Sequence, residues 1–399
     1  MTSNTQNRKD VVILSAVRTA VGTYGGSLKS TGPAELSARV TAEAVQRSGL
    51  APAEIQHSVF GNVIQTDPQD LYLSRVAAIK GGLPVETPAF TLNRLCGSGL
   101  QAIVSAAQLI MLGDVEAAVA GGAENMSLSP YWSTGMRWGQ RMGDGKLIDI
   151  MNAALHDPFH NIHMGVTAEN LAEKFQISRE EQDAYAVESH RRAARAIQSG
   201  YFKEQILPIE VKSGKKTSLF DTDEHVRPEV TIEDMARLPT VFKPGGTVTP
   251  GNASGLNDGA AAVILASGEL ASRKGLKALA RLVAYAHAGV EPEIMGIGPV
   301  PAVRKVMDRA GLRIADMDVI EANEAFAAQA LAVLKELGLP PERTNPNGSG
   351  ISLGHPIGAT GCIITVKALY ELHRIGGRYA LVTMCIGGGQ GIAAIFERI

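Results

Sequence analysis

The chain has 399 residues, of which 45% are hydrophobic and 20% are charged, so it can bury a large core and exceeds the usual size of a single domain. This composition excludes a disordered protein. A formal net charge of −2 excludes a strongly basic protein, and with it the binding of nucleic acid or of an anionic membrane surface as the main function.

The N-terminal part of the chain predicts strands and helices in alternation. Val11–Val17 is an apolar run typical of a buried strand, and the segment 34–48 has the pattern of a helix that ends at Gly49. This order predicts a parallel sheet. The run Val11–Val17 is too short for the core of a signal peptide, and we expect no apolar stretch long enough to cross a membrane, so the sequence predicts a cytoplasmic protein.

Two pairs of segments repeat along the chain. Residues 47–55 resemble residues 309–317, and residues 97–103 resemble residues 359–365. Both pairs are separated by 262 positions. A common spacing for two separate matches predicts a molecule of two similar halves.

The segment between the repeats has no counterpart. Residues 125–250 are rich in turns and charge, with a predicted helix at 178–199 and a predicted loop at 211–237, and an apolar strand at 260–266 follows. We therefore expect an N-terminal half formed by residues 1–124 and 251–270, an inserted loop domain at 125–250 and a C-terminal half at 271–399.

Two thiols and one imidazole lie in glycine-rich turns. Cys96 precedes a predicted helix at 99–112, whose positive end favours a thiolate. His355 lies beside a proline and glycines and could take the proton of that thiol. Cys385 precedes Gly387 and two further glycines, whose amides could form an oxyanion hole.

Each of these residues also has a structural interpretation. Either thiol could be a small buried hydrophobic side chain, as we expect for Cys362, and a lone histidine is more often structural than catalytic. Asn323 could be no more than the N-cap of an apolar helix. The cysteines lack the spacing of a zinc site or a disulfide scaffold, and Pro158 interrupts the helical spacing of three nearby histidines, so we expect no metal.

Six blocks of sequence in order resemble the thiolase family, and within it bacterial acetyl-CoA acetyltransferases and β-ketothiolases. The blocks are Asn93–Leu100, His163–Asn170, Gly251–Asp258, Asn323–Phe326, Gly354–Gly358 and Cys385–Gly389. The resemblance covers nearly the whole chain. It implies an α/β thiolase fold, with two similar βα halves in a five-layered αβαβα arrangement and an inserted loop domain.

The resemblance also implies catalytic roles. Cys96 would be the nucleophile that becomes acylated, His355 the base that activates it, and Cys385 the acid and base for the α-proton of the second substrate. Asn323 would hold a water that forms one oxyanion hole with His355. The backbone amides of Cys96 and Gly387 would form the other.

Substrates and assembly follow from the same resemblance. The reaction would be the reversible condensation of acetyl-CoA with acetyl-CoA, or with a short acyl-CoA such as propionyl-CoA, to 3-oxoacyl-CoA and CoA, with no further cofactor and in a homotetramer built from two dimers. Arg227 would meet the nucleotide of CoA. The positions that would follow its pantetheine arm or acyl group are His163, Met164, Ala253, Ser254, Met295 and Phe326.

The preferred acyl length stays open. Residues 347–352 and 93–95 resemble β-ketothiolases of polyhydroxyalkanoate synthesis that accept longer chains. Two alternatives also stay open. One is a decarboxylating condensing enzyme of the ketoacyl-synthase type, which characteristically has histidine where Cys385 stands, and the other is a thiolase-like carrier that binds acyl-CoA without turnover.

Overall fold

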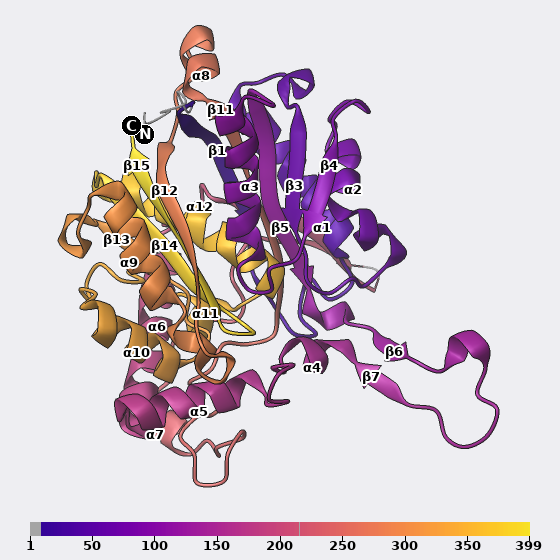
Figure 1. The fold of residues 1–399 in the computed structure, drawn as a ribbon, viewed down its shortest axis with the longest axis vertical. Helices are drawn as coiled ribbons and strands as arrows, with labels where there is room; N and C mark the ends of the chain where they lie inside the picture. Colours follow the sequence, from indigo (N-terminus) through magenta and orange to yellow (C-terminus); the bar gives the residue numbers. More distant parts are fainter. Residues whose placement is uncertain (1–8, 215) are drawn as a thin grey trace, which may run out of the picture.

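The computed structural model describes residues 9–214 and 216–399 (Figure 1). The elements before the inserted segment are β1 (Val11–Thr19), β2 (Gly22–Thr23), α1 (Pro33–Ser48), β3 (His57–Gly61), α2 (Leu73–Lys80), β4 (Ala89–Leu92), α3 (Ser98–Leu112) and β5 (Ala117–Asn125). The inserted segment contains β6 (Tyr131–Ser133), β7 (Leu147–Asp149), α4 (Ile150–Ala154), α5 (Met164–Phe175), α6 (Arg179–Gln198), β8 (Ile206–Leu207), β9 (Ile209–Ser213), β10 (Lys216–Phe220) and α7 (Ile232–Ala236). The elements after it are β11 (Asn257–Ser267), α8 (Gly268–Lys274), β12 (Ala280–Gly289), α9 (Pro299–Ala310), β13 (Val319–Ala322), α10 (Ala327–Leu337), α11 (Gly350–Leu353), α12 (Ile357–Ile375), β14 (Tyr379–Ile386) and β15 (Gln390–Arg398).

The main sheet consists of two similar halves that meet at β1 and β12. Its strand order is β13-β14-β15-β12-β1-β11-β5-β3-β4. The contact between β1 and β12 is short, with Val12 opposite Arg281 and Ile13 opposite Ala280. On either side of this junction the strands follow the same order, because β11, β5 and β3 take the places that β15, β14 and β13 take in the second half.

The prediction of a parallel sheet is wrong for the strands at the centre. β3 pairs in parallel with β5 and β4, and β13 with β14, but β11 and β15 are antiparallel to their neighbours. The reason is the connection between strands. A short turn at residues 387–389 joins β14 to β15, with Gly388 and Gly389 at φ 80° and 86°, and consecutive strands joined by such a turn run antiparallel. β5 and β11 pair in the same way, with the inserted segment in place of the turn.

The predicted repeat agrees with the arrangement of helices. α3 and α12 begin at corresponding places in the two halves and pack against each other between the sheets. Two glycines separated by 262 positions allow this close approach. A Cβ atom on Gly99 would lie 2.6 Å from the backbone nitrogen of Cys362, and one on Gly361 would lie 2.3 Å from that of Leu100.

The three largest apolar cores hold five layers together, and the central one lies on both sides of the middle helices. α1 and α2 cover the outer face of the first half-sheet, α9 covers that of the second, and α3 and α12 fill the space between them (Figure 1). β11 shows how one strand serves two cores. Ala261, Val263 and Leu265 face the central helices, whereas Ala262 and Ile264 face the outer layer.

The stretch Leu95–Leu112 corrects the expectation that no segment could cross a membrane. Its 18 residues have a mean hydropathy of 1.6, which is apolar enough for a span. Most of it is α3, which packs against α12 in the central layer with 61% of the stretch buried. Its apolar character is therefore accounted for by the core.

The inserted segment forms a base beneath the sheets and an arm that projects from it (Figure 1). The predicted helix at 178–199 is confirmed as α6, which starts after the N-cap Ser178. The predicted loop at 211–237 is wrong in part, because it includes the end of a β9–β10 hairpin and the helix α7. The first four residues of β10 are exposed and mostly polar, so this strand lacks the apolar alternation by which strands are recognised.

Candidate active site

Cys96 lies in a tight turn between β4 and α3. Leu95, beside it, has a φ of 45°, a left-handed conformation that is uncommon for leucine and typical of strained functional turns. Asn93 Oδ1 accepts a hydrogen bond from the Leu95 backbone N–H at 2.8 Å, and Ser98 Oγ donates to the Leu95 carbonyl at 2.7 Å. These bonds hold a turn in which the backbone N–H of Gly387, from the other half, reaches the Cys96 sulfur.

The expectation that helix α3 favours a thiolate does not hold for the resting protein. Enclosure of the sulfur raises the pKa of Cys96 to about 11, although hydrogen bonds from the backbone of Gly387 and of Cys96 itself lower it. Desolvation therefore outweighs the helix terminus. Cys96 is a neutral thiol at pH 7 and needs a base to become a nucleophile.

His355 is a buried neutral imidazole with one nitrogen available. Burial lowers its pKa to about 4. Its Nδ1 lies 2.7 Å from Thr360 Oγ1, and that hydroxyl donates its own proton to the Pro356 carbonyl at 2.9 Å. Nδ1 must therefore carry the hydrogen and donate it to Thr360, which leaves a lone pair on Nε2. The geometry thus provides a base at Nε2.

Asn323 and Cys385 lie close to these groups. Asn323 Nδ2 is 3.5 Å from His355 Nε2, and within the described part of the chain Asn323 Oδ1 has no hydrogen-bond partner. The interpretation of Asn323 as a helix N-cap is wrong, because α10 begins only after Phe326. Cys385 is fully buried at the end of β14, and burial together with the nearby Cys96 raises the pKa of its thiol.

A cavity of about 480 Å³ connects these residues to the surface. Cys96, His355 and Gly387 lie on its wall. Six other predicted positions also line it, namely His163, Met164, Ala253, Ser254, Met295 and Phe326. The walls are mostly apolar, so the cavity suits a long, largely uncharged ligand whose reactive end reaches Cys96.

Comparisons with known proteins agree with this arrangement. The family model described as the thiolase N-terminal domain matches residues 11–269, and the model of the thiolase C-terminal domain matches residues 276–398. The chain belongs to the thiolase family. The predicted family and five-layered α/β fold are thereby confirmed.

Related thiolases match along almost their full lengths. The β-ketothiolase BktB of Cupriavidus necator is 65% identical over 98% of this chain and 100% of its own, and an acetyl-CoA acetyltransferase of Pseudomonas aeruginosa is 51% identical over the same shares. Among solved structures, the Bacillus anthracis acetyl-CoA acetyltransferase has a TM-score of 0.95 at 49% identity, covering 98% of this chain and 99% of its own. The human mitochondrial 3-ketoacyl-CoA thiolase in complex with CoA has a TM-score of 0.95 at 46% identity and covers 98% of each chain.

Three predicted residues of this thiolase do not line the cavity, namely Asn323, Cys385 and Arg227, of which the first two are buried. Arg227 is exposed and does not line the wall, and its backbone N–H donates to Nδ1 of His190 at 3.1 Å. Its side chain is therefore placed to meet only a part of a ligand that extends beyond the cavity.

Sequence reasoning missed two contributors to the site. Thr360, which fixes the tautomer of His355, lies five positions further on in the first turn of α12, and that spacing could have identified it. Phe242 lines the cavity and stacks on His163 with ring centroids 4.6 Å apart. Its surroundings in the sequence resemble any surface loop, so no local signal pointed to it.

Proposed function

We propose that this thiolase is an acetyl-CoA C-acetyltransferase, or β-ketothiolase, that catalyses reversible Claisen condensation of acetyl-CoA with acetyl-CoA or a short acyl-CoA. The observation that carries the proposal is the meeting of Cys96, the neutral His355 and the Gly387 amide on one apolar cavity. The substrates are CoA thioesters, and no metal or further cofactor takes part. The proposed domain division is 1–124 with 251–270, 125–250, and 271–399.

Acyl transfer to Cys96 is the first step. Nε2 of His355 takes the thiol proton, and the sulfur attacks the carbonyl carbon of acetyl-CoA. The negative charge that develops on the carbonyl oxygen is met by the backbone amides of Cys96 and Gly387. The bond to the CoA sulfur then breaks, and His355 returns its proton to that sulfur. One oxyanion donor is typically worth about 10²–10³ in rate.

Carbon–carbon bond formation is the second step. Nε2 of His355 first takes the proton of the Cys385 thiol, the resulting thiolate removes an α-proton from the second acetyl-CoA, and the enolate oxygen is stabilised by the protonated His355 and by a water held on Asn323. The unpaired Oδ1 of Asn323 supports this role for the amide. The carbanion attacks the acyl-Cys96 carbonyl, which releases 3-oxoacyl-CoA and the Cys96 thiolate, and His355 returns its proton to that thiolate. In the reverse direction the raised pKa of Cys385 suits it to return the proton.

CoA would extend from Cys96 along the cavity toward the surface. His163, Met164, Ala253, Ser254, Met295 and Phe326 would contact the pantetheine arm or the acyl group, because they line the wall. Arg227 would meet the anionic nucleotide outside the cavity. We propose a preference that includes acyl groups longer than acetyl and a role in supplying polyhydroxyalkanoate synthesis, as the resemblance of residues 347–352 and 93–95 implies. The 65% identity to a protein named as a β-ketothiolase supports the reaction class.

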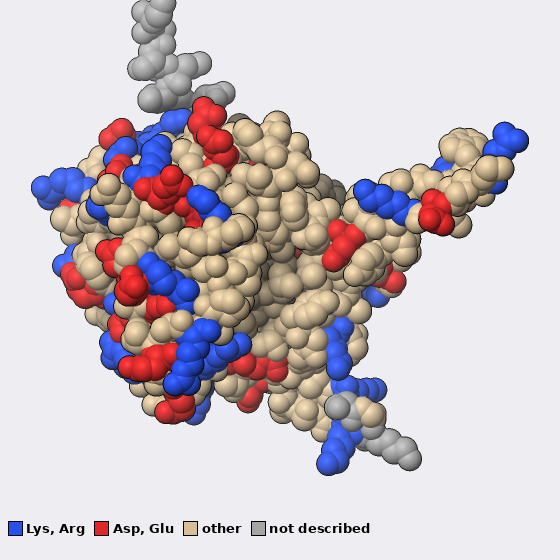
Figure 2. Space-filling model, turned by 90° about the horizontal axis from the view of Figure 1, so that it is seen from below, with Lys and Arg blue, Asp and Glu red and all other residues tan. Residues whose placement is uncertain are grey.

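We also propose a cytoplasmic homotetramer, built as a dimer of dimers. Support for the assembly comes from the arm at residues 131–149, which projects away from the molecule (Figure 2). The arm exposes large apolar side chains, among them Trp132, Met136, Trp138 and Met142. Exposed apolar surface of this extent is typical of a protein–protein contact. The three free cysteines agree with a reducing compartment.

Two variants test the mechanism. Cys96→Ala should not be labelled by radioactive acetyl-CoA, and a variant that is still acylated would remove Cys96 from its role. Cys385→Ala should be acylated but fail to condense, and normal turnover would contradict the use of two thiols.

A thiolysis assay with 3-oxoacyl-CoA substrates of increasing length tests the activity itself. Turnover with a short-chain preference is expected. No thiolysis combined with condensation that requires malonyl-CoA would favour the decarboxylating enzyme. Tight binding of acyl-CoA without turnover would favour the carrier.

A further inference from the structure

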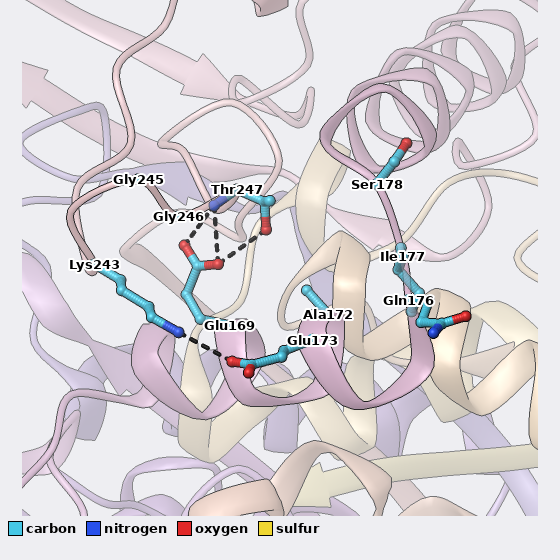
Figure 3. Close-up of a pocket in the computed structure, with 10 residues that line it drawn as sticks. All are labelled: Glu169, Ala172, Glu173, Gln176, Ile177, Ser178, Lys243, Gly245, Gly246 and Thr247. Atoms are coloured by element: carbon cyan, nitrogen blue, oxygen red, sulfur yellow. Dashed lines mark hydrogen bonds and ion pairs between the residues drawn. The ribbon is translucent and has the colours of Figure 1, made fainter.

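A buried carboxylate on α5 holds the loop that carries Phe242. Glu169 is 3% exposed, and its two oxygens accept hydrogen bonds from three donors of the loop. The Thr247 backbone N–H lies 2.8 and 2.9 Å from the two oxygens, the Thr247 hydroxyl lies 2.9 Å from Oε2, and the Val248 N–H lies 2.8 Å from Oε1. Figure 3 shows this carboxylate pointing from the helix into the loop.

The loop fits closely over the carboxylate. A Cβ atom on Gly246 would collide with Glu169 Oε1, so the backbone can approach only because residue 246 is glycine. Gln182 Nε2 donates to the Thr247 hydroxyl at 2.9 Å, and the Val241 N–H donates to the Val248 carbonyl at 3.3 Å. Residues 241–248 therefore form a closed loop that is fixed at one end by Glu169.

The same loop forms part of the cavity wall. Phe242 lies parallel to His163 at an interplanar angle of 17° and meets Phe326 edge-on at 6.1 Å between centroids. His163 is the N-cap of α5, and Glu169 lies further along that helix. One rigid helix thus presents His163 to the cavity and holds, through Glu169, the loop whose aromatic ring packs on His163.

We propose that Glu169 is a positioning residue for acyl-CoA binding, which acts by holding Phe242 against His163. This inference rests on the proposed function, since it assigns the cavity to CoA thioesters. Glu169 touches none of Cys96, His355 or Cys385, so its effect is on binding and not on the chemical steps.

The KM and kcat values of single variants separate binding from chemistry. In Glu169→Gln one acceptor oxygen becomes an amide that faces a loop donor, so hydrogen bonds to a charged group are lost. We expect KM for acetyl-CoA to rise about tenfold while kcat changes by less than about twofold. Glu173→Gln is the matched control, because Glu173 lies one turn further on α5 and pairs with Lys243 of the same loop at 3.1 Å, but is exposed (Figure 3). Its KM should equal that of the wild type.

A double-mutant cycle shows whether Glu169 acts through the ring. Phe242→Ala should raise KM by itself, and Glu169→Gln in that background should raise it no further. If the two effects multiply, or if Glu169→Gln lowers kcat as strongly as it raises KM, the proposal is overturned. If circular dichroism shows that Glu169→Gln is unfolded, Thr247→Val decides the cycle in the same way, because it removes the hydroxyl that donates to Glu169 and accepts from Gln182.

Wild-type turnover distinguishes a failure of the proposed function from a failure of the role of Glu169. A wild-type protein that performs no thiolysis would contradict the proposed function. An active wild-type protein whose variants behave independently would contradict only the role of Glu169.

Discussion

The contact between α3 and α12 gives a prediction that links packing to catalysis. In Gly361→Ala the new Cβ would lie 2.3 Å from the backbone nitrogen of Leu100 and 2.9 Å from its Cβ. Two non-bonded carbon or nitrogen atoms must lie a little more than 3 Å apart, so α3 and α12 must separate by roughly 1 Å. Overpacking typically costs about 1–3 kcal/mol, and the better helix propensity of alanine returns about 1 kcal/mol. We therefore expect a net loss of about 0–2 kcal/mol in the free energy of unfolding.

The loss of activity in Gly361→Ala should exceed the loss of stability. α3 begins two residues after Cys96, and α12 begins two residues after His355, so moving the helices apart would move the proposed nucleophile away from its proposed base. A displacement of about 1 Å can cost about 10²-fold in rate. The assays are urea unfolding followed by circular dichroism and thiolysis of acetoacetyl-CoA by the folded variant.

Gly268→Ala is the control for this prediction. Gly268 is the first residue of α8, and a Cβ there would meet its nearest neighbour, the Asp10 Cβ, at an ordinary 3.5 Å. It should have wild-type stability and activity. A Gly361→Ala protein that also matches the wild type in both assays would refute the reasoning.

Three further predictions concern charge and assembly. Enclosure raises the pKa of Cys96 to about 11, so its thiolate fraction should grow over the whole range up to that pH. The rate of alkylation of Cys96 by iodoacetamide should therefore still increase above pH ~8.5. A rate that reaches its plateau below pH ~7.5 would reveal a preformed thiolate. Arg18 and Asp223 form a fully buried ion pair at 2.7 Å, so Asp223→Asn should lower the free energy of unfolding in urea by about 3–5 kcal/mol. Glu116→Gln, which breaks an exposed pair, should cost less than about 1 kcal/mol, and equal losses would contradict the argument from burial. Trp138, 92% exposed on the arm, should be buried in the proposed tetramer, so Trp138→Ser should shift the mass measured by light scattering from that of a tetramer toward that of a dimer. A mass equal to that of the wild type would exclude this contact.

The fold was predictable where its signals are local. Val11–Val17 and the segment 34–48 were recognised because a buried strand and an amphipathic helix have characteristic patterns over a few turns. The direction of strand pairing was not predictable in this way. The βα order at the start of the chain gives no indication that β11 returns antiparallel after an insertion of more than a hundred residues.

The residues of the candidate site were likewise predictable only where the signal is local in the sequence. Glycine-rich turns indicated Cys96, His355 and Cys385 as candidate reactive groups, since close backbone approach depends on residues adjacent in the chain. Thr360 lies within one helical turn of His355 and could also have been recognised. Phe242 could not, because its partner His163 is distant in the sequence and the contact exists only after the inserted segment has folded.

The sequence by itself determined which thiols and imidazoles this protein carries, its two similar halves, and the glycine-rich turns in which Cys96, His355 and Cys385 lie. The tertiary structure alone decided their ionisation and their distances. Cys96 is neutral because the atoms that surround its sulfur raise its pKa, and Nε2 of His355 carries the lone pair because Nδ1 donates to Thr360, whose own hydroxyl donates to the Pro356 carbonyl. Desolvation depends on everything that surrounds a group in space, so no pattern along the chain can specify it.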